Sequence, residues 1–290
     1  MGKCIDSLLV GGKEIEIIIV NDGSVDKTAE IAEEYVKKYP GKILLHQNTN
    51  NLGVTRNFLE GAKRADGNYI MFCDQDDVWL PNKIEKTLQK IKDRESHLGT
   101  NTPIAVFTDA KLVDGVLRTI SDSFFGYNGL NTKKIDLAHL LMENKVIGCT
   151  TIFNKAVADM IINFPSLARY HDWWIGLIAA TFGEISFLDE PTMLYRQHGK
   201  NVVGSQNFVS YVVNRIKNIA TQRKSLFENE RQAWEFYEIY QSYLLEEQGQ
   251  IIRDFAGIHS ANWFEKRERL FRYGFWKSGI LRNLGLVLLI

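Results

Sequence analysis

The chain has 290 residues, of which 45% are hydrophobic and 24% are charged, a composition typical of globular proteins. Its 35 Lys and Arg residues balance 35 Asp and Glu residues, which argues against a nucleic-acid-binding protein. The cysteines Cys4, Cys73 and Cys149 lie far apart without zinc-site spacing, so we expect a reducing, cytoplasmic environment. No run of about eighteen apolar residues occurs, so no membrane span is predicted.

The first hundred residues alternate between predicted helices and strands. In order, we expect a helix over 1–10, a strand over 15–20, a helix ending before Pro40, a strand over 43–46, a helix from Gly53 to about Gly67, a strand over 69–73 and a helix over 82–94. Regular alternation of this kind predicts an α/β fold, with a mostly parallel sheet and helices on both of its faces.

The pattern changes after Pro103. In order, we expect strands over 104–108 and 116–118, an aromatic and glycine-rich loop over 121–130, a helix near 135–142, another ending before Pro165, a helix over 171–182, a strand over 185–188, and helices throughout from about Phe208. A boundary near Gly204 would divide the chain into an α/β domain over 1–204 and a helical C-terminal region over 205–290.

Carboxylates follow two of the predicted strands directly. Asp22 ends the strand over 15–20, and Asp74, Asp76 and Asp77 end the strand over 69–73. The carboxyl ends of strands in an open α/β sheet form the edge where ligands bind. Oxygen ligands at this spacing suit Mg²⁺ or Mn²⁺ holding a diphosphate. The alternative is an acidic, solvated turn that caps the next helix, and for an isolated Asp-x-Asp pattern this alternative is the more common one.

Several motifs together resemble family 2 glycosyltransferases. The motifs are Ile17–Ser24 (IIIVNDGS), Asn51–Asn57 (NLGVTRN) and Asp74–Asp77 (DQDD). That family has the GT-A fold, a Rossmann-like domain for nucleotide-diphosphate sugars. Two further motifs, His171–Trp174 (HDWW) and Leu194–Gly199 (LYRQHG), are similar to a subgroup of bacterial rhamnosyltransferases of surface polysaccharides. The resemblance runs in family order through the α/β domain.

The resemblance implies a set of donor-side roles. Asp22 would bind the pyrimidine or ribose of the donor with Arg56 nearby, and Asp74 would approach the ribose. Asp76 would bind Mg²⁺ or Mn²⁺ on the diphosphate, with His198 as a further metal or diphosphate contact. Each residue also has a structural interpretation, because Asp22 suits a turn, Arg56 a helix surface and His198 a loop.

On the acceptor side, the resemblance implies that Asp172 is the general base. Trp173 or Trp174 would stack on the acceptor sugar. The implied reaction is an inverting, single-displacement transfer to a saccharide or lipid-linked acceptor, with dTDP-rhamnose as the expected donor. The structural alternatives are a helix cap for Asp172 and core packing for the two tryptophans.

One departure from the family pattern concerns the first strand. Family members begin with a further hydrophobic strand in the middle of the nucleotide-binding sheet, and no such strand precedes the helix predicted over 1–10. The absence of this strand would leave the backbone hydrogen-bonding groups of its two neighbouring strands unpaired. We expect that the sequence lacks its natural start. The alternatives are a non-catalytic relative that binds a nucleotide or a partner, and a nucleotidyltransferase, although the latter normally has a glycine-rich basic loop that we do not find.

The C-terminal region combines basic, aromatic and apolar residues. The stretch from Glu265 to Arg282 contains two acidic residues, Glu265 and Glu268, and six cationic residues: Lys266, Arg267, Arg269, Arg272, Lys277 and Arg282. Phe271, Phe275, Trp276 and an apolar end over 284–290 accompany them. Such a segment suits peripheral contact with the inner face of the membrane. A helix that packs on the catalytic domain or in a homodimer is an equal alternative.

Overall fold

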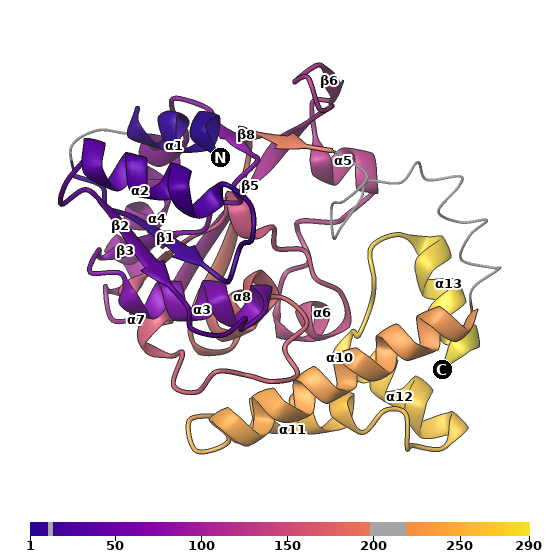
Figure 1. Cartoon of the computed structure of the whole chain (residues 1–290). Coiled ribbons are helices and arrows are strands. Elements are labelled where there is room, and N and C mark those ends of the chain that lie inside the picture. Colours follow the sequence, from indigo (N-terminus) through magenta and orange to yellow (C-terminus); the bar gives the residue numbers. More distant parts are fainter. Residues whose placement is uncertain (11–13, 198–218) are drawn as a thin grey trace.

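The computed structural model describes residues 1–10, 14–197 and 219–290. An α/β unit forms one side of the molecule and a helical region the other (Figure 1). The strands are β1 (Ile17–Asn21), β2 (Ile43–Gln47), β3 (Tyr69–Met71), β4 (Val78–Trp79), β5 (Ile104–Val113), β6 (Thr119–Ser121), β7 (Ile152–Asn154) and β8 (Glu184–Arg196). The helices of the α/β unit are α1 (Gly2–Leu9), α2 (Thr28–Lys38), α3 (Val54–Arg64), α4 (Lys83–Leu98), α5 (Phe124–Asn128), α6 (Leu137–Met142), the 3₁₀ turn η1 (Gly148–Thr150), α7 (Lys155–Asp159) and α8 (His171–Phe182). The C-terminal helices are α10 (Ile219–Tyr240), α11 (Glu246–Ala256), α12 (Trp263–Tyr273) and α13 (Ile280–Leu289).

The main sheet is mixed, so the prediction of a mostly parallel sheet is wrong. Its order is β3-β7-β5-β8-β4, with β6 paired to β5. Within the described residues, only β5 and β8 run parallel in it, while β7 is antiparallel to both β3 and β5, and β4 is antiparallel to β8. Parallel pairing needs a long crossover connection, whereas the short helices and loops of the second half let strands enter in either direction.

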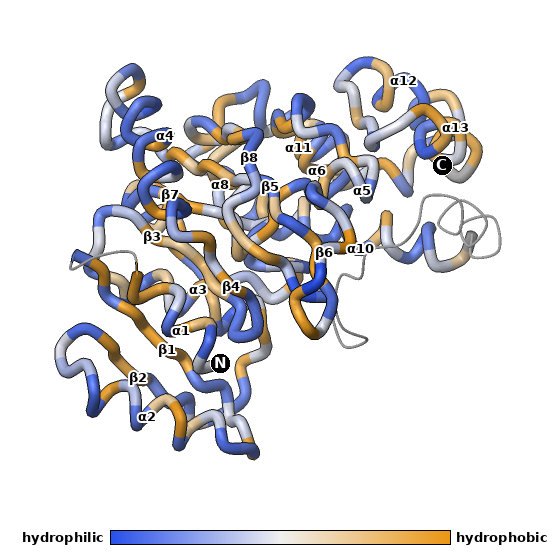
Figure 2. Tube along the Cα trace, turned by 90° about the horizontal axis from the view of Figure 1, so that it is seen from above, coloured by the Kyte–Doolittle hydropathy of each residue, from blue (hydrophilic) through white to orange (hydrophobic). Residues whose placement is uncertain are grey.

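β1 and β2 form a separate parallel pair, in register from Ile17 opposite Ile43 to Asn21 opposite Gln47. Among the described residues, β1 pairs with β2 and β3 pairs with β7, so the two sheets share no ladder. Figure 2 shows β1, β2 and α2 together at one end of the molecule.

β5 is the centre of the fold. Every residue of it except Lys111 is buried, because helices cover both sheet faces. Ile104 and Val106 pack with Ile91 of α4, whereas the alternate residues Ala105 and Phe107 belong to the larger core that includes α8. The predicted strand over 104–108 therefore extends five residues further, to Val113.

β8 is longer than predicted. It contains the predicted strand over 185–188 and continues through the segment that ends at Arg196. Its pairing with β5 shifts register between Thr108 and Asp109, opposite Pro191. A proline has no N–H to give to a ladder, so an irregularity at this point is expected.

Two predictions between β5 and α6 are corrected. The short strand falls at β6, after Leu117 in a left-handed conformation with φ of 68°, and not over 116–118. The expected loop over 121–130 contains α5, whose start is capped by Ser123 accepting from Gly126 N–H. Asp109 Oδ1 also accepts from Phe124 N–H at 2.9 Å, so a buried carboxylate orders the segment.

The helical region packs on α8 through aromatic residues. The rings of Trp174 and Phe236 pack edge-on with their centres 5.1 Å apart, and the ring centres of Phe182 and Tyr240 are 5.3 Å apart. The Tyr240 hydroxyl donates to the Met160 carbonyl at 2.6 Å. Residues 219–290 thus share the core of the α/β unit, while the expected boundary at Gly204 lies outside the described residues.

Candidate active site

The acidic turn lies between β3 and β4, as the sequence predicts for carboxylates that follow a buried strand. Asp77 N–H donates to the Asp74 carbonyl at 3.4 Å and closes the turn. The end of β8 secures it, because Arg196 N–H donates to Asp77 Oδ1 at 3.1 Å and Arg196 Nε donates to the Asp76 carbonyl at 3.0 Å. The second oxygen of the buried Asp77, Oδ2, has no hydrogen-bond partner within the described part of the chain.

One group of potential ligand atoms converges in this turn. Within residues 1–10, 14–197 and 219–290, the side chains of Asp74, Asp77 and Cys149 place theirs within 4.8 Å of one another. Burial and then the charge of Asp76 raise the pKa of Asp74 to about 6. Burial and then the charge of Asp74 raise the pKa of Asp77 to about 7. Two crowded carboxylates and an unpaired buried oxygen fit a divalent cation.

Within this group, the carboxylates are the suitable ligands for Mg²⁺ or Mn²⁺. Burial raises the pKa of Cys149 well above its usual value, so the sulfur stays protonated and does not suit a hard cation. The prediction singled out Asp76, yet Asp77 and not Asp76 belongs to the converging group. The sequence Asp74-Gln75-Asp76-Asp77 contains both residues, and the conformation of the turn determines which of the two carboxylates lies near Asp74 and Cys149.

Lys83 is a member of the site that sequence reasoning missed. It is fully buried in the first turn of α4, donates to Thr192 Oγ1 at 3.2 Å, and lies 4.8 Å from the centre of the Trp79 ring. Burial lowers the pKa of Lys83 to about 8, against the opposing effect of the nearby Cys149, Cys73 and Asp77. A lysine in the first turn of a helix is normally exposed, so the local sequence did not indicate that Lys83 is buried beside the acidic turn.

Asp22 organises the loop before α3. Its carboxylate accepts from the N–H groups of Leu52 at 2.8 Å and Gly53 at 2.9 Å, and from Asn48 Nδ2 at 2.8 Å. Burial acts to raise the pKa of Asp22, but these three hydrogen bonds outweigh it and lower the pKa. Gly53 has a φ of 78°, which glycine adopts without strain. The two motifs Ile17–Ser24 and Asn51–Asn57 therefore form one structure.

Arg56 lies in the first turns of α3. Its Nε donates to Glu60 Oε1 at 2.8 Å, and its guanidinium lies 5.4 Å from the centre of the Phe164 ring. The side chain is 51% exposed, so the ion pair with Glu60 contributes little stability and leaves the guanidinium accessible to a ligand.

Asp172 lies half-buried in the first turn of α8. It accepts from Gly148 N–H at 2.9 Å, Asn144 Nδ2 at 3.1 Å and Trp173 N–H at 2.6 Å. Burial raises the pKa of Asp172 to about 6 against these hydrogen bonds, and the charge of Asp74 adds to the rise. Gly148, which donates to Asp172, directly precedes Cys149, whose sulfur lies within 4.8 Å of ligand atoms of Asp74 and Asp77, so η1 connects Asp172 to the acidic turn.

Gly148 permits this geometry and was not predicted. A Cβ on Gly148 would lie 2.6 Å from His171 Nε2 and 3.4 Å from the Asp172 Cβ, so the turn approaches α8 more closely than a side chain allows. His171 stacks on Phe58 at 4.0 Å and meets Phe72 edge-on at 4.8 Å. Burial lowers the pKa of His171 to about 3, which keeps its imidazole neutral.

The expected acceptor stacking by Trp173 and Trp174 is not supported. Trp173 is 3% exposed and donates from Nε1 to the Leu140 carbonyl at 2.6 Å, and Trp174 is fully buried. A ring without an exposed face cannot stack on a sugar, so both are core residues. The mean apolarity of α8 explains this, since helices that are apolar all round are buried.

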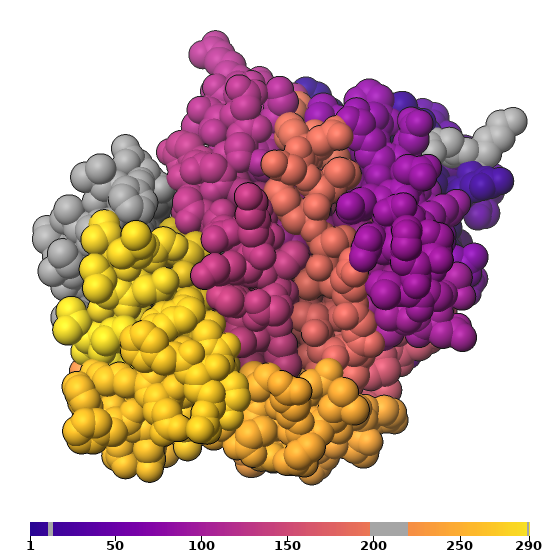
Figure 3. Space-filling model, turned by 180° about the vertical axis from the view of Figure 1, so that it is seen from behind, coloured from indigo at the N-terminus to yellow at the C-terminus, as the bar shows by residue number. Residues whose placement is uncertain are grey.

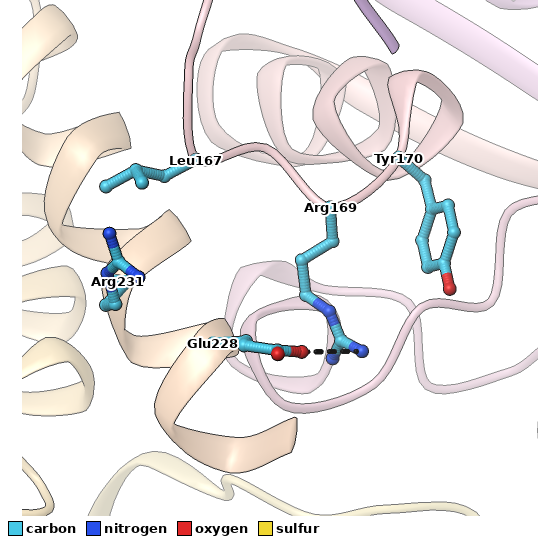
Figure 4. Close-up of a pocket in the computed structure, with 5 residues that line it drawn as sticks. All are labelled: Leu167, Arg169, Tyr170, Glu228 and Arg231. Carbon is cyan, nitrogen blue, oxygen red and sulfur yellow. Dashed lines mark ion pairs between the residues drawn. The ribbon is translucent and has the colours of Figure 1, made fainter. Parts of the chain in front are cut away.

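A cavity of about 310 Å³ lies between the segment preceding α8 and α10. Figure 4 shows the ion pair of Arg169 with Glu228 beside it, at 3.3 Å, and Arg231 on the α10 side. Tyr170, the N-cap residue of α8, completes the lining with Leu167. The cavity therefore lies at the end of α8 that holds Asp172. His198 is outside the described residues.

Asp22 follows β1, Asp74 follows β3 and Asp172 lies on α8, an arrangement typical of α/β proteins that bind ligands at the carboxyl ends of their strands. The profile described as Glycosyl transferase family 2 matches residues 1–138, and the chain belongs to this family.

Two curated relatives agree with this assignment. The dTDP-rhamnosyl transferase RfbG of Shigella flexneri is 32% identical over 206 residues, 66% of each protein. The putative glycosyltransferase EpsH of Bacillus subtilis is 31% identical over 198 residues, 65% of this chain and 54% of the relative. The chain thus spans between about half and two thirds of the length of these relatives.

Two solved structures show a common GT-A-like fold. Residues 1–349 of S. aureus TarS match with a TM-score of 0.56 and 20% identity, covering 93% of this chain and 67% of that one. The mannosyltransferase PcManGT from Pyrobaculum calidifontis, in complex with GDP-Man and Mn²⁺, matches with a TM-score of 0.53 and 14% identity, covering 99% and 74%.

Proposed function

We propose that the chain transfers a sugar from a nucleotide-diphosphate donor to a hydroxyl group of a saccharide or lipid-linked acceptor, with inversion. The observation that carries the proposal is the environment of Asp172. It is a half-buried carboxylate on α8, joined to the acidic turn through η1, and burial raises its pKa to about 6. Such a group is ionised at neutral pH, yet is more basic than an ordinary aspartate, which suits a general base.

The hydrogen bonds of Asp172 support this role. A carboxylate offers about four lone-pair positions, and Asn144, Gly148 and Trp173 occupy three of them. The remaining position can accept the proton of an acceptor hydroxyl while the others keep the carboxylate oriented. The attacking oxygen then forms the new glycosidic bond as the bond to the diphosphate breaks, so no covalent enzyme intermediate is required.

On the donor side, Asp74 and Asp77, whose carboxylates converge in the acidic turn, would hold Mg²⁺ or Mn²⁺, with Asp76 of the same turn as the further ligand that the family resemblance implies. A bound metal ion would neutralise the diphosphate as it leaves. Asp22 would meet the base or ribose through the loop that it orders, and Arg56 would lie near the base. His198 would be a further diphosphate contact.

The acceptor would bind at the cavity beside α8 and not on the tryptophans. Tyr170 and Arg231 offer donors that suit sugar hydroxyls or a phosphate, whereas the Arg169 guanidinium is bound by Ser225, Asn229 and Glu228 and would shape the wall of the cavity. Rhamnose is the proposed sugar and dTDP-rhamnose the proposed donor, because the motifs His171–Trp174 and Leu194–Gly199 and the similarity to RfbG point the same way. The product would then be part of a surface polysaccharide.

A donor screen tests the proposal. The purified chain would be incubated with Mn²⁺, an acceptor mixture and single nucleotide-diphosphate sugars, with release of the nucleotide diphosphate as the readout. We expect release with dTDP-rhamnose, its loss in Asp172→Asn, and normal release in the control Asp159→Asn, whose side chain is 64% exposed on α7. Release that is equal in wild type and Asp172→Asn would contradict the role of the base.

A second candidate, a nucleotide-binding relative without turnover, is favoured by one observation. β1 and β2 are separate from the main sheet, although Asp22 at the end of β1 would help to bind the donor. Calorimetry with dTDP and Mn²⁺ distinguishes the two, because binding without release of product for every donor and acceptor in the screen would select the second candidate.

A further inference from the structure

We propose that the outer surface of α12 and α13 binds an anionic membrane from one side. This inference does not depend on sugar transfer. Figure 1 shows the two helices at the C-terminal end of the molecule, and Figure 3 shows the C-terminal helices exposed beside the α10–α11 surface. Among the described residues, no helix is both long and apolar enough to cross a bilayer, so the contact would be peripheral.

α13 has the reverse of the polarity expected of a solvent-facing helix. Ile280, Leu281, Leu284 and Leu288 fall within an arc of about 100° on one face, and each is between 55% and 82% exposed. The polar Arg282 is directed to the protein instead, donating to Glu143 Oε1 at 3.1 Å and to the Asn128 carbonyl at 2.7 Å. A helix in water would normally turn its polar face outward.

α12 continues this surface with aromatic residues. Trp263, Phe264 and Phe271 are between 59% and 78% exposed and share one helix face with Arg267. The Arg267 guanidinium lies 3.8 Å from the centre of the Trp263 ring and donates from Nη2 to the Val287 carbonyl at 2.8 Å. That hydrogen bond joins α12 to α13, and Figure 2 shows the two helices side by side, each with exposed apolar residues.

The charge of this segment favours an anionic lipid surface as the occupant. Residues 263–290 contain six Lys or Arg residues and two Glu, and after the pairs of Arg269 with Asp254 and Arg282 with Glu143 are counted the balance is plus two, whereas the whole chain has a net charge of zero. Exposed aromatic and leucine side chains flanked by cations are the features with which interfacial helices enter the boundary between headgroups and acyl chains. Basic residues near that boundary are attracted to anionic lipids.

Vesicle binding by the full chain tests the proposal. We would compare sedimentation with vesicles of phosphatidylcholine alone and with vesicles containing 30% phosphatidylglycerol. We expect binding to the anionic vesicles only, weakened by 0.5 M salt, and at least tenfold weaker for Leu284→Gln/Leu288→Gln. The control is Val116→Gln/Ile120→Gln, two exposed apolar residues distant in sequence, which should bind as wild type does.

Three outcomes would overturn the proposal. They are equal binding to neutral vesicles, unchanged binding of the α13 variant, and a dimer in analytical ultracentrifugation that the α13 variant dissociates. The last result would show that a second copy covers this surface. Circular dichroism of both double variants confirms their folding, and none of these measurements requires a sugar donor.

Discussion

The close approach of η1 to α8 makes Gly148→Ala the sharpest test of the site. The new Cβ would lie 2.6 Å from His171 Nε2, well inside the contact distance. The imidazole has little room to move, because Phe58 stacks on it at 4.0 Å and Phe72 meets it at 4.8 Å. Overpacking of this kind typically costs about 1–3 kcal/mol, so we expect a loss of that size in the free energy of unfolding.

The same substitution should change the chemistry of Asp172. Moving η1 away lengthens the hydrogen bond from Gly148 N–H to Asp172 Oδ2, now 2.9 Å. That hydrogen bond lowers the pKa of Asp172. Its loss should therefore raise the pKa, and the acid limb of the activity profile should move to higher pH.

Urea denaturation and a pH–rate profile measure the two effects. Gly115→Ala is the matched control, since a Cβ at the exposed Gly115 meets no atom within 4 Å and should change stability by less than about 0.5 kcal/mol. His171→Ala in the Gly148→Ala background should relieve the clash, so the two changes should not be additive. If Gly148→Ala matches Gly115→Ala in both stability and pH profile, the reasoning about this contact is refuted.

Three further predictions follow from single side chains. Asp172→Asn should lower kcat by about 10²–10⁴-fold with little change in the Kd for the donor measured by calorimetry. In the wild-type enzyme, kcat/KM should fall below a pH of about 6 as Asp172 becomes protonated. A normal kcat in the variant would contradict the role of the base. Trp174→Ala should cost about 3–5 kcal/mol in urea denaturation without raising the acceptor KM at a temperature where it is folded, and a selective rise in that KM would restore the stacking role. Lys83 has a folded pKa of about 8, below its ordinary 10.5, so the unfolded chain binds more protons between these values and wild-type stability should rise with pH across that window. Lys83→Met should remove this rise and stabilise the protein at pH 7 by up to about 3 kcal/mol, whereas an unchanged slope would show that Lys83 is not buried as described.

Local patterns in the sequence predicted the elements that depend on neighbouring residues. Apolar stripes and stop signals placed the early strands and helices, and the helix over 171–182 has the bounds of α8. The rule that ligands bind at the carboxyl ends of strands placed Asp22 and Asp74 at the ends of β1 and β3. These features are encoded over a few residues, so they can be read without the rest of the chain.

Only the tertiary structure decided strand direction and the neighbours of each site residue. The antiparallel entry of β7, the pairing of Asp77 with Arg196, and the approach of Gly148 to His171 join residues between 23 and 119 positions apart. Trp174 changed from an expected acceptor contact to a core residue because α10 covers it. Contacts of this range arise when the chain packs, and no short pattern carries them.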